Sequence, residues 1–174
     1  MQKQMGNLWF RLMALEYRLN SKSISLLKTL QDAGIQPGMS VLDFGCGPGR
    51  FALPAAQMVG SQGAVYAADV HPLAIKMTER TAAKARLTNL STIRSDCGTE
   101  LPTNCIDVVL LYDALHDVKD KQGVLKELHR VLKPYGTLSY RDHTLNGEPL
   151  LSLLRSNGFS LQNETPTQFI FRKS

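Results

Sequence analysis

Apolar positions recur along the chain in two patterns, which together predict alternating strands and helices. Short apolar runs bounded by turn residues are typical of buried strands, and apolar residues three or four positions apart are typical of amphipathic helices. The predicted helices are residues 7–19, 21–34, 49–59, 72–87, 124–132 and 148–157. The predicted strands are residues 40–44, 63–69, 91–94, 106–113, 137–141, 159–164 and 167–173.

The order of these elements predicts an α/β fold. Strands that alternate with helices of this length form a parallel sheet covered by helices on both faces. The last two strands are separated only by a turn around Pro166, so they must pair antiparallel. We therefore expect a three-layer sandwich: a seven-stranded, mostly parallel sheet with an antiparallel C-terminal hairpin and helices on both faces. Residues 1–34 are expected to form a helical extension, and residues 35–174 the main domain.

Two segments that contain proline lead to expectations of their own. Pro54 falls inside the predicted helix 49–59, where the loss of one backbone hydrogen bond should bend the helix. Residues 133–136, Lys-Pro-Tyr-Gly, should stop the preceding helix and turn the chain into strand 137–141.

The composition limits the class of protein. A chain of 174 residues with 43% hydrophobic and 20% charged residues is expected to form a globular domain. No apolar run reaches the roughly 18 residues that a membrane span needs, and Arg11, Glu16 and Arg18 interrupt the N-terminal segment where a signal peptide would be apolar. We therefore expect a cytoplasmic protein with no membrane span. Three cysteines without a C-x-x-C pair argue against a disulfide framework and a structural zinc site.

The net charge is +5, a mild basic excess. Such an excess could attract an anionic substrate or RNA. The basic residues form no dense run, so we interpret the excess as a solvated face. Nucleic acid is therefore a possible partner that the sequence does not favour.

Residues 41–49, Val-Leu-Asp-Phe-Gly-Cys-Gly-Pro-Gly, carry the most informative motif. Three glycines at alternate positions follow a predicted buried strand and precede a helix, which leaves room for a nucleoside ligand to approach the backbone. The spacing differs from the dinucleotide fingerprint G-x-G-x-x-G, because Arg50 holds the position of its last glycine. A phosphate-binding loop is excluded too, since no Gly-Lys-Ser/Thr follows.

The acidic residue Asp43, two positions before the first glycine of G-x-G-x-G, makes this stretch resemble motif I of the class I S-adenosylmethionine-dependent methyltransferases. The resemblance covers the chain from about residue 35 to the C-terminus. It implies S-adenosyl-L-methionine as the cofactor and S-adenosyl-L-homocysteine as its product. It also implies the seven-stranded architecture, with its terminal antiparallel hairpin, for which this family is known.

Several strand ends offer candidate contacts to this cofactor. Asp43 is expected to attract the ammonium group, although it could also cap the backbone of its own turn. Asp69 is expected to bind both ribose hydroxyls, and its alternative role is the N-cap of helix 72–87. The resemblance implies that Asp96 binds the adenine amino group, unless it forms an Asx turn instead. The predicted cofactor-binding residues are Asp43, Gly45, Cys46, Gly47, Gly49, Asp69, Val70, His71, Asp96, Cys97, Tyr112, Asp113 and Leu115.

The resemblance implies that the segment after the fourth strand lies beside the sulfonium and faces the acceptor. This segment lacks the N/D-P-P-Y/F box of many amino-nitrogen methyltransferases, and no Pro-Cys nucleophile of cytosine-C5 enzymes is present. A base matters when the acceptor is a hydroxyl; His116 is the first candidate and His143 the second, and each could instead be a loop histidine. A metal site built from Asp113, Asp142 and His143 is conceivable, but the pattern does not indicate one, so no metal is predicted.

Residues 128–138, LHRVLKPYGTL, strengthen the likeness to small-molecule methyltransferases such as those that act on quinone rings, although Tyr135 stands where that group usually has glycine. We therefore predict methyl transfer to a small-molecule acceptor by in-line displacement at the sulfonium. The alternatives are an RNA or protein methyltransferase, and a non-catalytic module that binds S-adenosylmethionine. Residues 5–20 are expected to form a lid or a homodimer contact, because apolar groups lie on more than one side of that helix.

Overall fold

The computed structural model describes residue 6, residues 23–144 and residues 146–174. The helices are α2 (Ser23–Asp32), α3 (Ala52–Val59), α4 (Pro72–Lys84), the short 3-10 helix η1 (Leu115–Asp117), α5 (Lys121–Val131) and α6 (Gly147–Ser156). The strands are β1 (Ser40–Phe44), β2 (Ala64–Asp69), β3 (Leu90–Arg94), β4 (Ile106–Tyr112), β5 (Leu132–Arg141), β6 (Phe159–Thr165) and β7 (Gln168–Lys173). The helix expected at 7–19, with the lid and dimer contact assigned to residues 5–20, lies outside the described ranges.

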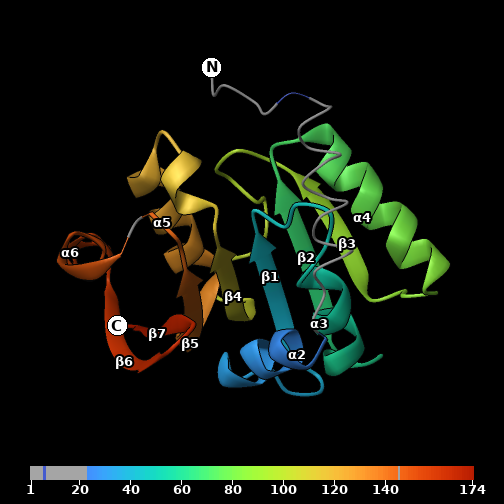
Figure 1. The fold of residues 1–174 in the computed structure, drawn as a ribbon, viewed down its shortest axis with the longest axis horizontal. Helices are drawn as coiled ribbons and strands as arrows, with labels where there is room; N and C mark the ends of the chain where they lie inside the picture. Colours follow the sequence, from blue (N-terminus) through green and yellow to red (C-terminus); the bar gives the residue numbers. More distant parts are fainter. Residues whose placement is uncertain (1–5, 7–22, 145) are drawn as a thin grey trace.

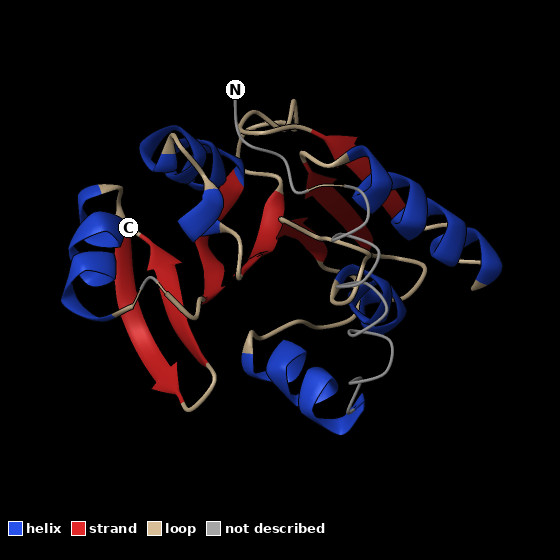
Figure 2. Cartoon of the chain, turned by 45° about the horizontal axis from the view of Figure 1, so that its top comes forward, coloured by secondary structure: helices blue, strands red, loops and turns tan. Residues whose placement is uncertain are grey.

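All seven strands form one sheet in the order β3-β2-β1-β4-β5-β7-β6 (Figure 1). The five strands from β3 to β5 are parallel to their neighbours, whereas β7 is antiparallel to both β5 and β6. Figure 2 shows this sheet between helices on either side. The predicted α/β sandwich with a C-terminal antiparallel hairpin is therefore confirmed.

Each face of the sheet carries its own apolar core. On one face, α2 and α3 pack against β1, β2 and β4. On the other face, α5 and α6 pack against the central strands and the hairpin. Alternate residues of β4 supply both cores, as the two-residue period of a strand requires: Val108 and Leu110 face α3, and Val109 and Leu111 face α5. A strand covered on both sides reads as a continuous apolar run, which is the pattern seen in the sequence.

Helix α2 belongs to the first of these cores. Leu30 is fully buried, and it shares a cluster with Val41 and Val108. Gln168 of the hairpin donates its side-chain N–H to the carbonyl of Thr29 at 3.0 Å, which ties α2 to the opposite end of the chain. No helix within residues 23–144 and 146–174 is both long enough and apolar enough to cross a membrane.

Pro54 does not disturb its helix as expected. Helix α3 begins at Ala52, so Pro54 is its third residue. Backbone N–H groups in the first turn of a helix have no partner within the helix. The expected loss of an internal hydrogen bond is therefore wrong, because the helix starts three residues later than predicted.

The segment 133–136 is an irregular part of β5 rather than a turn before it. Ile106 pairs with Leu132 and Val108 pairs with Thr137, so residues 133–136 bulge out of the ladder. Tyr135 has φ 62°, and it is 81% exposed. The expected stop of the helix is confirmed, but strand β5 begins at Leu132, earlier than predicted.

The connection between β3 and β4 crosses the sheet without a helix. Residues 95–105, all of which the structure describes, contain bends and turns but no helix or strand. They are held to α5 by Glu127, whose carboxylate accepts hydrogen bonds from the amide and the hydroxyl of Thr99. Arg130 also donates to Glu127, and these bonds lower the pKa of Glu127 to about 2. An irregular segment thus takes the place that a crossover helix would fill.

Candidate functional site

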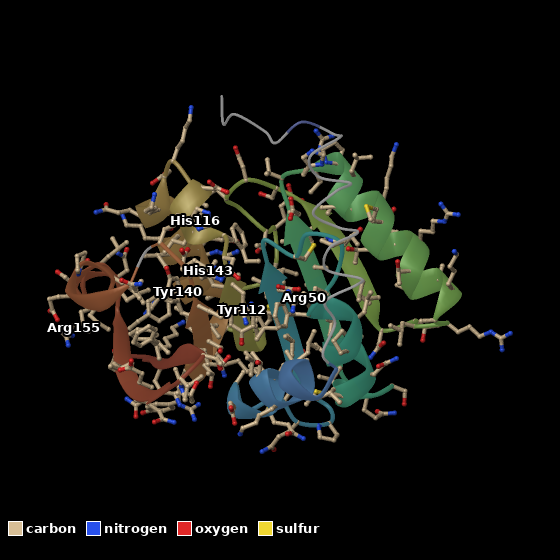
Figure 3. All side chains as sticks on the ribbon, in the orientation of Figure 1. Arg50, Tyr112, His116, Tyr140, His143 and Arg155 are labelled. Carbon is tan, nitrogen blue, oxygen red and sulfur yellow. The ribbon has the colours of Figure 1, made fainter. Side chains whose placement is uncertain are left out.

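The candidate site lies where the carboxyl ends of the central parallel strands meet. The glycine turn follows β1, Asp69 ends β2, and the segments 113–118 and 142–144 follow β4 and β5. In open α/β sheets, ligands bind at this edge, where the strand order reverses. Figure 3 shows His116 and His143 at this end of the sheet, with Arg50 beside the glycine turn.

The glycine turn has a backbone that other residues rarely adopt. Gly45, Gly47 and Gly49 have φ values of 82°, 53° and 86°. The amides of Gly45 and Cys46 donate to the carbonyl of Ala68 at 2.8 and 3.0 Å, so the turn is fixed to the end of β2. A side chain at Gly45 would collide with the Cβ atom of Ala114, which brings the turn against the segment after β4.

Replacing Gly45 by alanine should therefore lower the free energy of unfolding by about 2–3 kcal/mol, because the added Cβ is both strained at positive φ and in collision with Ala114. Gly47→Ala is the matched control, since its Cβ would meet nothing within 4 Å and only the strain of about 1 kcal/mol remains. In urea unfolding, the double variant Gly45→Ala/Ala114→Gly should regain the extra stability that Gly45→Ala loses relative to Gly47→Ala. Equal losses in the two single variants would contradict this explanation.

Asp69 joins the end of β2 to the glycine turn. Its Oδ2 accepts the amide N–H of Gly47 at 2.9 Å, and its Oδ1 accepts the amide of His71 at 2.7 Å. Burial raises the pKa of Asp69, whereas these two backbone hydrogen bonds lower it. The N-cap of α4 is His71, whose Nδ1 accepts the amide of Leu73 at 3.1 Å. The alternative that Asp69 caps this helix is therefore wrong.

Asp43 is buried beneath the same turn, with only 2% of its surface exposed. It accepts a hydrogen bond from the amide of Ala52, but its Oδ2 has no hydrogen-bond partner among the described residues. Burial raises the pKa of Asp43 to about 7, with the charge of Asp69 adding to the rise and the amide of Ala52 opposing it. A buried carboxyl oxygen without a donor fits a ligand that carries a positive group, as S-adenosylmethionine does. The chain therefore has the acceptors that this cofactor needs.

The thiol of Cys46 is buried in the glycine turn, and burial raises its pKa well above the usual range. Beyond β3, the hydroxyl of Ser95 accepts the amide of Cys97 at 3.1 Å, so Ser95 forms this turn. The side chain of Asp96 is exposed at the bend, and Cys97 is half-buried with a pKa raised by partial burial. Both thiols are therefore held in the protonated form.

Tyr112 points into the core rather than toward the edge of the sheet. Its hydroxyl is 2.7 Å from Ser139 Oγ and donates to Gln168 Oε1 at 2.9 Å. Burial raises the pKa of this phenol. Leu115 is likewise fully buried, in the core beneath α5. Any contact of Tyr112 or Leu115 with a ligand would therefore be made by the backbone.

Asp113 lies in a cluster of charges at the end of β4. Its backbone has φ 51°, and its Oδ2 lies 3.1 Å from Arg141 Nη2. Nδ1 of His143 lies 2.5 Å from the other oxygen, although the His143 side chain is 80% exposed. The guanidinium of Arg141 also stacks 5.1 Å from the ring centroids of both Phe51 and Tyr112. Asp113 thus holds Arg141 against two buried aromatic rings.

His116 and Asp142 form a contact that the sequence did not reveal. Nδ1 of His116 lies 2.9 and 3.1 Å from the two oxygens of Asp142. The sequence suggests Asp142 only as a member of a conceivable metal set with Asp113 and His143. In the described part of the chain, no group of three or more His, Cys, Asp or Glu side chains is arranged to hold a metal ion. The signal for the contact was that Asp142 directly follows β5 and that His116 lies in the segment after the neighbouring strand β4.

A family model described as a methyltransferase domain matches residues 35–168. The ubiquinone/menaquinone biosynthesis C-methyltransferase UbiE of Ectopseudomonas mendocina is 32% identical over 126 residues, which are 71% of this chain and 49% of that protein. UbiE of Shewanella oneidensis is 33% identical over 113 residues, 63% of this chain and 45% of that protein. The chain thus spans about half the length of the curated relatives it matches.

Solved structures confirm the fold. A SAM-dependent methyltransferase from Aquifex aeolicus superimposes with a TM-score of 0.83 at 22% identity, covering 98% of this chain and 100% of that one. The family model covers β1 to β6 and so includes the strand ends that make up the site. The chain therefore belongs to the methyltransferase domain family, and the predicted class I fold is confirmed.

Proposed function

We propose that this chain transfers a methyl group from S-adenosylmethionine to a small-molecule acceptor. The observation that carries the proposal is the link between the glycine turn and Asp69, which places open backbone and a carboxylate at the ends of β1 and β2. When bound, S-adenosylmethionine supplies a methyl group on a sulfonium, which is a good leaving group. The protein's main contribution is then to hold donor and acceptor in line.

The residues that would hold the cofactor follow from their places in the site. The glycine turn, where a Cβ at Gly47 would meet nothing within 4 Å, would let the methionine part of the cofactor approach the backbone, and Asp43 would face the ammonium. Asp69 would accept hydrogen bonds from the ribose hydroxyls with its remaining lone pairs. Residues Val70, His71, Asp96 and Cys97 would surround the adenine, and the backbone of residues 112–115 would lie near the sulfonium.

Two observations favour a small molecule over RNA or protein. Basic side chains near the site are held in contacts of their own: Arg141 pairs with Asp113, Arg50 lies 5.6 Å from the ring centroid of Phe51, and Lys121 donates to two backbone carbonyls. They therefore form no open basic face of the kind that binds nucleic acid. The UbiE relatives are named as C-methyltransferases of ubiquinone and menaquinone biosynthesis, which supports a quinone-related ring compound as the acceptor class.

A turnover assay tests the proposal. The chain should release S-adenosylhomocysteine from S-adenosylmethionine only when a suitable acceptor is present, and the product should carry the labelled methyl group. A panel of ring hydroxyl compounds, amines and a short RNA separates the acceptor classes. Binding of S-adenosylmethionine with no product from any of the panel would favour the non-catalytic binding module instead.

Of the two predicted bases, His116 is better placed than His143. His116 is 31% exposed and its Nδ1 is bound to a fully buried carboxylate. His143 is 80% exposed and contacts Asp113, which already pairs with Arg141. We therefore assign the base to His116 and place His143 at the rim of the site.

A further inference from the structure

The ring of His116 is held by a buried carboxylate from the neighbouring strand end. Asp142 Oδ2 lies 2.9 Å from Nδ1 of His116, and the same oxygen accepts the backbone N–H of His116 at 3.3 Å. The side chain of Asp142 has no exposed surface. One carboxylate therefore fixes both the ring and the backbone of the histidine.

Asp142 is itself held from two other directions. Its Oδ1 accepts the amide and the hydroxyl of Thr144, both at 2.9 Å. The hydroxyl of Tyr140, a fully buried residue, hydrogen-bonds to the Asp142 side chain. Burial and then the charge of Asp142 raise the pKa of Tyr140, so its phenol stays protonated and donates. A carboxylate that accepts this many donors is set in place before any substrate arrives.

The segment that carries His116 is anchored on its other side as well. Lys121, in the first turn of α5, donates to the carbonyl of Val118 at 2.8 Å and contacts that of His116 at 3.4 Å. The second ring nitrogen, Nε2, lies 3.4 Å from Asp117, whose side chain is 73% exposed. Nε2 is therefore the ring nitrogen beside an exposed carboxylate, and an acceptor that reaches it would replace the contact with Asp117.

We propose that His116 is the general base of the reaction and that Asp142 is the positioning residue that keeps its proton on Nδ1. The inference rests on the proposed methyl transfer. A carboxylate on Nδ1–H fixes the imidazole tautomer and leaves the lone pair of Nε2 free to take a proton. Tyr140 and Thr144 hold the carboxylate in place.

This assignment identifies the acceptor class as a compound with a phenolic or enolic hydroxyl. The hydroxyl proton passes to Nε2 of His116, giving an imidazolium that Asp142 stabilises. The oxygen lone pair forms a bond to the methyl carbon as the carbon–sulfur bond breaks, and that electron pair stays on sulfur. The imidazolium then releases the proton to water. A neutral amine would attack through its own lone pair, so it would not need this base for the methyl-transfer step.

The tautomer of His116 is the first test, and it needs neither cofactor nor acceptor. In ¹⁵N NMR of the ligand-free protein at pH 8, Nδ1 should be protonated and Nε2 should not. In Asp142→Asn the Nε2–H form should become the major tautomer. The matched control is Asp117→Asn, which removes the other carboxylate near the ring and should keep the Nδ1–H form. A native protein with the proton on Nε2 would overturn the proposal, even if Asp142→Asn does not fold.

Turnover is the second test. With benzene-1,4-diol as acceptor, His116→Gln should lower kcat by about 100-fold or more, which is the range of general-base catalysis. The Kd of S-adenosylmethionine should stay within threefold of its value in the unmodified protein. If His116 only supported the structure of the site, its replacement would weaken cofactor binding as well. The acidic limb of the kcat profile should also disappear in His116→Gln. The groups that face this histidine and shape that limb are Asp142, Tyr140, Asp117 and Lys121, with the Asp113, Arg141 and His143 cluster beside them.

The acceptor panel separates the remaining outcomes. Product from phenols with the expected loss in His116→Gln supports the assignment. Product from benzylamine alone, unchanged in His116→Gln, overturns both the base and the acceptor class. If neither compound gives a product and S-adenosylmethionine does not bind, the proposed function itself is contradicted. The ¹⁵N NMR measurement tests the position of the proton on His116 independently of this result.

Discussion

Replacing Asp69 by asparagine is expected to weaken the binding of S-adenosylmethionine about 100-fold. Each carboxylate oxygen already accepts one backbone N–H, and each is expected to accept a ribose hydroxyl as well. Hydrogen bonds to a charged acceptor contribute roughly 1.5–3 kcal/mol each, so the loss of one or two corresponds to this factor. Titration calorimetry of the variant against the unmodified protein measures it.

Two controls separate the loss of a ligand contact from the loss of the fold. Glu164→Gln removes an exposed carboxylate from β6, away from the site, and should leave the Kd unchanged. Asp69→Asn also changes the acceptor of two backbone hydrogen bonds from a charged to a neutral group. Urea unfolding of this variant therefore shows how much stability it has lost. If asparagine prevents folding, Asp69→Glu serves instead and should weaken binding by moving the carboxylate. A Kd within threefold of the unmodified protein in a folded variant would contradict the ribose assignment.

Replacing Asp43 by asparagine should remove much of the pH dependence of stability between pH 5 and pH 8. The pKa of Asp43 is about 7 in the folded protein and near 3.8 in the unfolded chain. The folded state therefore binds more protons in this window, and stability falls as the pH rises through it. The free energy of unfolding falls by about 1.4 kcal/mol for each pH unit, and by less close to the folded pKa. Between pH 5 and pH 7, Asp43 alone therefore lowers the free energy of unfolding by about 2 kcal/mol.

The test compares urea unfolding curves of Asp43→Asn and the unmodified protein at several pH values. Because other groups titrate in both proteins alike, the difference between the two curves isolates Asp43. Binding provides a second readout: a cationic group near Oδ2 favours the ionised carboxyl, so S-adenosylmethionine should bind more tightly as the pH rises to about 7, but not in the variant. Parallel pH profiles in the two proteins would show that this carboxyl has an ordinary pKa.

The fold and the position of the site could be predicted from local patterns. Apolar runs such as 106–113 give buried parallel strands, and a carboxylate or glycine directly after such a run must lie at the carboxyl edge of the sheet. The alternation within β4 also carried a signal for the orientation of Tyr112, which was predicted to contact the cofactor. Tyr112 shares its face with Val108 and Leu110, so its side chain had to point toward the core.

Pairings between distant residues were not predictable in the same way. His116 and Asp142 are 26 positions apart, and they meet because β4 and β5 are neighbours in the sheet. The sequence places each after a strand but does not show which way its side chain turns. The contact of Tyr112 with Gln168 spans 56 positions and depends on how β7 is placed. The spacing of residues along the chain does not predict which side chains from distant segments come into contact.

The glycine turn and Asp69 are expected to form the site for S-adenosylmethionine. Isothermal titration of the purified protein with S-adenosylmethionine, S-adenosylhomocysteine and NAD measures whether they do. We expect micromolar binding of both sulfur compounds and none of NAD, because Arg50 stands where a dinucleotide site needs its last glycine. Binding of NAD, or of neither sulfur compound, would contradict this expectation.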